Sequence, residues 1–168
     1  MGVLTSIPRE AIKGTGGLQY VLVSNFDDVS TSIDSSTGIA TFDPSSNSAW
    51  KKYVPRKESS NFTETETGTP ASGITSYNQV LTLVFAYNQS AKRNELKVLG
   101  QSEVRAVAVD RNGNAWLLGA EFGLDLTSGT IVSGTVPTDM NGMTVILAGN
   151  EREPMAIVPA ATLTLITP

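Results

Sequence analysis

The stretch Gln79–Tyr87 constrains the fold of this chain more than any other part of its sequence. Alternate residues of a β-strand point to opposite faces of its sheet. Here both sets are mostly apolar, with Val80, Thr82, Val84 and Ala86 on one face and Leu81, Leu83, Phe85 and Tyr87 on the other. A strand that is mostly apolar on both faces is favoured in the middle of a sheet. The chain is therefore expected to fold around a central strand at Gln79–Tyr87.

Apolar or alternating runs bounded by Gly, Pro, Asn and Asp recur through the rest of the chain, as is typical of an all-β protein. The polar stretches Ser24–Thr37 and Ser128–Thr138 are expected to be loops. The C-terminal run Ala161–Ile166 is expected to be a last strand or an extension onto a neighbouring copy. Further strands are expected at Leu18–Val23, Gly38–Phe42, Trp50–Pro55, Val104–Val109, Ala115–Leu118, Glu121–Thr127 and Met143–Ala148.

One helix is expected, over about residues 90–99, with Ser90 as its N-cap and Gly100 as the glycine that follows its end. Leu96 and Leu99 share one face of this helix. A helix this short is not stable alone and must pack on a sheet. The expected fold is mainly β, a β-sandwich or barrel with one flanking α-helix.

Two Asn-Gly pairs are candidate turn positions, Asn112 with Gly113 and Asn141 with Gly142. The segment Asp110–Asn114 also places oxygen-bearing side chains at alternate positions, as the start of a calcium loop does. A calcium loop of the EF-hand type has glycine at its sixth position, whereas Gly113 is fourth. A hairpin turn is therefore the better interpretation, because glycine tolerates positive φ.

The chain is expected to form a single domain over residues 18–168, preceded by an N-terminal arm over residues 1–17. A second arm, a hairpin over about residues 50–73, is also expected. In that region Asn61–Glu66 ends in alternating Thr and Glu, so neither face of the strand suits a core. Such a strand makes sense as an arm that lies against other subunits.

The composition excludes several kinds of site. The sequence has no Cys and no His, which excludes a Cys nucleophile, a Ser-His pair and imidazole or thiolate metal sites. The carboxylate pairs Glu64/Glu66 and Glu151/Glu153 show no sign of the buried carboxyl that acid catalysis needs. The net charge of −4 argues against a surface that grips DNA phosphates. No run of 18 apolar residues is present. We therefore expect no enzyme activity, no cofactor, no metal and no membrane contact.

The second half of the chain resembles tail tube (major tail) proteins of tailed bacteriophages, and among these the proteins of phages that infect Bacteroidetes-type hosts. The resemblance rests on the order of strands and turns. It is looser for Tyr53–Glu66, which looks like the arm of that family, and for Tyr77–Tyr87 followed by a helix. The segments that carry it are Val104–Gly119, Phe122–Gly129, Ser133-Gly134, Asp139–Val145 and Gly149.

The resemblance implies a β-sandwich or barrel with a flanking helix, six copies of which form a ring whose inner strands join around a lumen. Stacked rings would make the conduit for the genome in the virion tail, assembled in the host cytoplasm. The implied partners are other copies of this chain, other tail proteins (terminator, baseplate or hub) and double-stranded DNA as non-specific passing cargo. Glu64, Glu66, Glu121 and Asp125 are expected to face the lumen, because they lie on expected strands with polar alternation.

Two other functions remain open at this point. A tail terminator or a head–tail connector ring would share the same fold, but would stop at one ring instead of polymerising. A carbohydrate- or protein-binding β-sandwich module would instead be a monomer with an aromatic patch.

Overall fold

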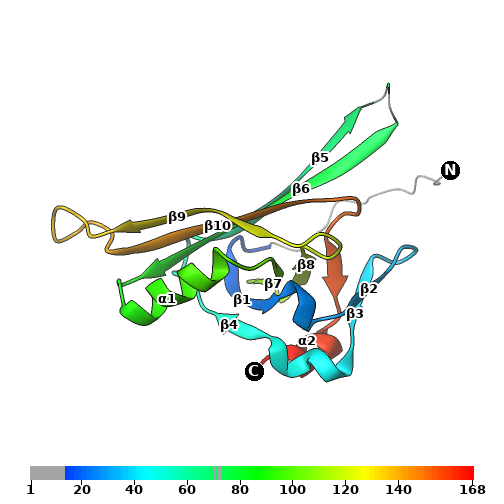
Figure 1. The fold of residues 1–168 in the computed structure, drawn as a ribbon, viewed down its shortest axis with the longest axis horizontal. Helices are drawn as coiled ribbons and strands as arrows, with labels where there is room; N and C mark the ends of the chain where they lie inside the picture. The colour runs from blue at the N-terminus through cyan, green and yellow to red at the C-terminus, as the bar shows by residue number, and fades with distance from the viewer. Residues whose placement is uncertain (1–13, 70, 72) are drawn as a thin grey trace.

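Two β-sheets form the framework of the computed structural model, which describes residues 14–69, 71 and 73–168 (Figure 1). The seven-stranded sheet has the order β2-β3-β11-β8-β7-β1-β4, and the four-stranded sheet the order β5-β6-β10-β9. The first contains β1 (Leu18–Asn25), β2 (Thr31–Asp34), β3 (Ile39–Phe42), β4 (Lys51–Tyr53), β7 (Val104–Asp110), β8 (Ala115–Leu118) and β11 (Ala156–Val158). The second contains β5 (Asn61–Thr69), β6 (Ile74–Ala86), β9 (Asp125–Val132) and β10 (Gly142–Glu151).

Short helices cover the seven-stranded sheet and flank the gap between the sheets. They are α1 (Ser90–Leu99), α2 (Ala160–Ile166) and the 3-10 turns η1 (Phe26–Asp28) and η2 (Pro44–Ala49). The predicted mainly-β fold with a flanking helix is confirmed, with α2 as a second helix. In Figure 1 the four-stranded sheet forms one side of the molecule, and every other labelled element lies on the opposite side of it.

The core has two parts because the seven-stranded sheet is covered on both faces. Between the sheets, Val21, Ala106 and Ala108 pack with Leu81, Leu83, Val145 and Leu147 of the four-stranded sheet. On the other face, Val107 and Val109 pack with Trp50 next to η2 and with Ile166 of α2. Strand β7 is therefore buried on both faces.

Strand β6 is central, as predicted, since it pairs with β5 on one side and β10 on the other. Its residues Leu81 and Leu83 are fully buried and face the seven-stranded sheet. Its opposite face carries Val80 and Thr82, which are half-buried, and Val84, which is buried.

The last helix corrects the expectation of a strand over Ala161–Ile166. Leu163 and Leu165 alternate in sequence, which looks like a strand, but Leu163 and Ile166 are three residues apart and both contact the core. A helix brings residues three apart onto one face, so α2 buries Ile166 and leaves Leu165 exposed.

Two expected loops contain strands. Residues 31–34 form β2, which returns through a turn at Gly38 (φ +66°) to pair with β3. Residues 125–132 form β9, so the expected strand Glu121–Thr127 starts later than predicted and takes in part of the expected loop Ser128–Thr138. Backbone pairing with β10 explains β9, because its polar edge sequence gives little periodic signal.

Helix α1 has the predicted bounds but different ends. Gln89 is its N-cap and makes no side-chain capping bond, so Ser90 is the first helical residue instead of the cap. Gly100 has a right-handed φ of −72°, not the left-handed conformation expected after a helix. A Cβ on Gly100 would lie 3.2 Å from a methyl of Leu126, so this glycine lets the helix end approach β9 closely.

The expected hairpin arm is displaced along the sequence. Strand β4 belongs to the seven-stranded sheet, whereas β5 and the first half of β6 form a hairpin that extends beyond the body (Figure 1). Of the expected N-terminal arm, residues 1–13 lie outside the described part of the chain. Thr15 is held by Asn112, whose side chain both accepts from its N–H and donates to its carbonyl.

Candidate functional site

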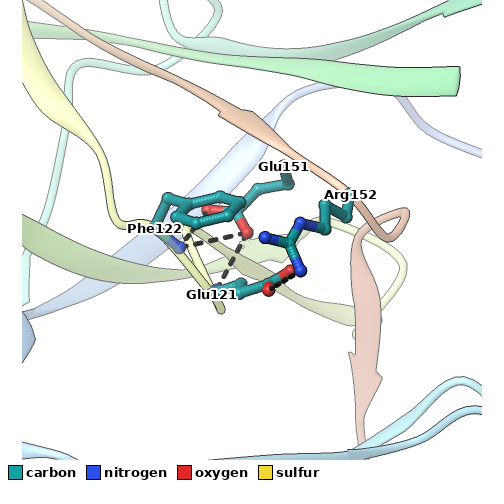
Figure 2. A network of polar contacts seen from close by, with 4 residues as sticks. All are labelled: Glu121, Phe122, Glu151 and Arg152. Atoms are coloured by element: carbon teal, nitrogen blue, oxygen red, sulfur yellow. Dashed lines mark hydrogen bonds and ion pairs between the residues drawn. The ribbon is translucent and has the colours of Figure 1, made fainter. Parts of the chain in front are cut away.

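A buried carboxylate, Glu151, lies at the end of β10 where the two sheets meet (Figure 2). Its carboxylate accepts hydrogen bonds from the backbone N–H of Glu121 at 2.8 Å and of Phe122 at 3.0 Å. The Glu121 side chain in turn forms an ion pair with Arg152 at 3.2 Å, and Arg152 lies over the Phe122 ring. Glu151 therefore fastens the turn between β8 and β9 to the end of the four-stranded sheet.

The same turn is also held by Arg105, which is buried too. The Arg105 guanidinium donates to the carbonyls of Ala120, Phe26 and Val29 and stacks on the Phe26 ring at 3.8 Å. Burial lowers the pKa of Arg105, and the charge of Glu151 opposes that shift. A cation and a carboxylate thus hold consecutive residues of one short segment, Arg105 at the carbonyl of Ala120 and Glu151 at the N–H groups of Glu121 and Phe122.

Burial raises the pKa of Glu151 above its usual value, and the backbone N–H donors only partly offset this. The expectation that Glu151/Glu153 holds no buried carboxyl is therefore wrong. A signal was present in the sequence, since Glu151 continues the alternation of the buried residues Val145 and Leu147 along β10. Among the described residues, this carboxylate accepts hydrogen bonds from backbone N–H groups, so the geometry indicates a structural anchor.

The free energy of unfolding is expected to change with pH as Glu151 titrates. Because its folded-state pKa lies above the unfolded value, the protonated form favours folding. This contribution is fully present below the unfolded pKa of about 4.3 and is lost as the pH rises through the folded pKa. We expect the unfolding free energy of the wild type, minus that of Glu151→Gln, to fall as the pH rises from about 4 to 7. Urea titrations of both proteins measure it, and a constant difference would contradict the prediction.

A second buried polar chain runs through Gln79, which is 1% exposed. Its side-chain carbonyl accepts from the N–H of Gly119 at 2.9 Å, and its NH₂ donates to Glu64 at 3.0 Å. Glu64 also accepts from the N–H of Met155 at 2.6 Å. These bonds tie β5 and β6 to the end of β8 and to the residue before β11.

The four residues expected to face a lumen do not share one face. Glu64 and Glu66 pair in register with Gln79 and Tyr77 and face the same side as Phe62, toward the seven-stranded sheet. Glu121 lies in the turn before β9 and not on a strand. Asp125 pairs with Ala148 and faces away from the seven-stranded sheet.

The Asn-Gly pairs lie at two different kinds of position. Gly113 has φ +86° in the β7–β8 connection, where the Asp110 carboxylate accepts from the N–H of Asn112 and Asn114. Gly142 starts β10, and a Cβ there would lie 2.1 Å from the Phe85 carbonyl. The described residues hold no group of three or more carboxylates that could bind a metal ion.

One face of the four-stranded sheet points away from the seven-stranded sheet and is called here the outer face. None of the elements labelled in Figure 1 covers it. The register puts on it mostly Thr, Ser, Asn, Ala and Val, and Asp125 is its one charged residue within the described strands. Its members are Asn61, Thr63, Thr65, Thr67, Thr69, Ile74, Ser76, Asn78, Val80, Thr82, Val84, Ala86, Asp125, Ser128, Thr130, Val132, Gly142, Thr144, Ile146, Ala148 and Asn150.

A small apolar hollow of about 230 Å³ lies between α1 and the sheets, lined by Tyr53, Phe85, Leu96, Leu99 and Met143. At its rim the Tyr53 hydroxyl donates to Glu95 at 2.5 Å. Burial, reinforced by Glu95, raises the pKa of Tyr53. Ligand sites usually have volumes of about 300–1,000 Å³, so this hollow is small for one.

No protein-family model, curated protein or solved structure matches the chain. Within the described residues, no helix has the length and apolar character needed to cross a membrane.

Proposed function

We propose that this protein is a structural virion protein, a phage tail tube subunit whose rings stack into a conduit for the genome. The observation that carries the proposal is the four-stranded sheet, whose outer face and two edges are left open by the described part of the chain. Strands β5 and β9 each pair with one neighbour in the described chain. An unpaired edge exposes backbone N–H and C=O groups that can pair with another chain.

The directions of the edge strands suit a head-to-tail ring. All neighbours in the sheet are antiparallel, so β5 and β9 at its two edges run in opposite directions. Copies related by rotation about one axis would therefore place β9 of one copy antiparallel to β5 of the next. The edges have similar lengths, with nine residues in β5 and eight in β9. Repeating this contact closes a continuous antiparallel barrel.

In such a barrel the outer face would line the lumen. The absence of Lys and Arg from the described strand positions of this face suits DNA passage, because no cation would hold the phosphates. Of the four carboxylates expected there, this arrangement places only Asp125 on the wall. The lumen would then be mainly uncharged, lined by hydroxyl and amide groups.

The half-buried apolar residues of the outer face fit the same arrangement. Val80 and Ile146 lie there among hydroxyl groups, partly exposed in the single chain. Curvature into a barrel would bring neighbouring side chains on the concave face closer together. In the virion the partners would be further copies, with terminator and baseplate or hub proteins at the tube ends. No enzymatic step is part of this function.

Electron microscopy of the purified protein, after light scattering to measure its mass, tests the proposal. Tubes or stacked rings are the expected result. Single rings that do not stack would favour a tail terminator or connector. A monomer at every concentration tested would contradict a ring protein and favour a β-sandwich binding module.

A further inference from the structure

We propose that neighbouring copies are locked by an ion pair between Glu66 on β5 of one copy and Lys97 on α1 of the next, with Arg93 one helical turn away. This inference rests on the ring arrangement of the proposed function. It adds one specific contact between copies. This contact would determine which strand pairs with β9 and in which register.

The receiving surface is an open groove of about 1050 Å³ between α1 and β9. Leu126, Ile131 and Met143 supply its apolar part. Arg93 and Lys97 line it from α1, and both side chains are exposed. Residues four apart lie on the same face of a helix, so these two cations form one positive strip along the groove.

Neither of these cations is in an ion pair with a carboxylate of the described residues. Among the described residues the two ion pairs are Arg111–Glu58 and Arg152–Glu121. Glu95, on the same helix, is engaged by the Tyr53 hydroxyl. Lys92 donates to the carbonyls of Ala86 and Tyr87, so it is also occupied. Among the described residues, the groove therefore offers two positive charges without a carboxylate partner, beside an edge strand that pairs on one side only.

The matching negative charge lies on the other edge of the sheet. Glu66 is exposed, is in neither of those ion pairs, and faces the same side of the four-stranded sheet as the groove. Glu64 faces that side too, but its carboxylate already accepts from Gln79 and Met155. Glu66 is thus the carboxylate on β5 that is available to a neighbour.

The offset of the two edges brings these charges together. Within one chain β5 pairs with residues 74–82 of β6, whereas β9 pairs with residues 142–148 of β10, near the other end of the sheet. Full pairing of β9 with β5 of a second copy therefore needs a shift along the strands, as closed barrels show. That shift places Glu66 beside the first residues of β9, where Gly100 at the end of α1 contacts Leu126. Lys97 lies one turn before that point.

Charge reversal with rescue tests the pair. Glu66→Lys and Lys97→Glu should each weaken assembly about tenfold in the protein concentration required, and the double variant should recover most of it. Glu103→Lys, the same charge change at an exposed position outside the four-stranded sheet and in neither of those ion pairs, is the matched control and should assemble like the wild type. If the wild type forms rings or tubes and Glu66→Lys assembles equally well, the ion pair is overturned. The proposed function would then still stand.

A crosslinking experiment is independent of any effect on stability. Because the chain has no Cys, a Glu66→Cys protein and a Lys97→Cys protein each carry one thiol. Mixed assemblies treated with a short bismaleimide should give a covalent dimer, and neither protein should give it alone. Assemblies that form without this mixed dimer would overturn the inference. Failure of the wild type to form any ring would instead contradict the proposed function itself.

Discussion

Glu151→Ala is expected to lower the free energy of unfolding by about 3 kcal/mol at neutral pH. The substitution would leave the N–H groups of Glu121 and Phe122 without their acceptor. A buried donor without a partner costs about 1–3 kcal/mol. It would also remove the carboxylate whose charge opposes the shift of the Arg105 pKa. Urea denaturation followed by circular dichroism measures the loss.

The control is Glu121→Gln, which removes a partly exposed ion pair with Arg152 in the same turn. Exposed ion pairs contribute about 0–1 kcal/mol, so this variant should unfold close to the wild type. Equal losses in the two variants would mean that Glu151 acts as a surface charge. Glu151→Gln should lie between them, because its amide oxygen can still accept from one N–H.

The parts of the fold that the sequence predicts are those with a strong local period. Strand β6 and helix α1 have apolar residues at spacings of two or of three and four, and their own side chains face the core. The seven residues of α2 are too few to separate these periods, because Leu163 and Leu165 fit a strand while Leu163 and Ile166 fit a helix. The contact of Ile166 with the second part of the core decides between them.

The edge strand β9 and the buried polar groups depend on distant partners. Ser128 and Thr130 carry little strand signal, and β9 exists because β10 supplies its hydrogen bonds. Glu151 looks like a surface residue in the run Glu-Arg-Glu-Pro, and its burial follows from the backbone donors of residues 121–122. The face on which Glu64 and Glu66 lie depends on the register with β6, which the alternation of Thr and Glu does not fix.

Thr82→Lys should convert an assembly that releases DNA into one that retains it. Thr82 lies in the middle of the outer face, between Asn61 and Ile146. In the proposed tube every copy would then present a cation to the lumen, so six copies would surround the duplex with several phosphate contacts. Binding through 6–10 phosphates weakens by about 10³–10⁵-fold between 50 and 200 mM salt. We therefore expect tight retention at low salt that is lost in this range.

Assembly in the presence of duplex DNA, followed by nuclease digestion, measures retention inside the lumen, because enclosed DNA resists the nuclease. Thr164→Lys is the matched control, since it adds the same charge at an exposed position of α2, on the far side of the seven-stranded sheet from the outer face. DNA bound by this variant should remain sensitive to digestion. Protection by both variants, or by neither, would contradict the assignment of the outer face to the lumen. Loss of assembly in Thr82→Lys alone would show that this face is itself a contact between copies, because a lysine on an open wall faces only solvent.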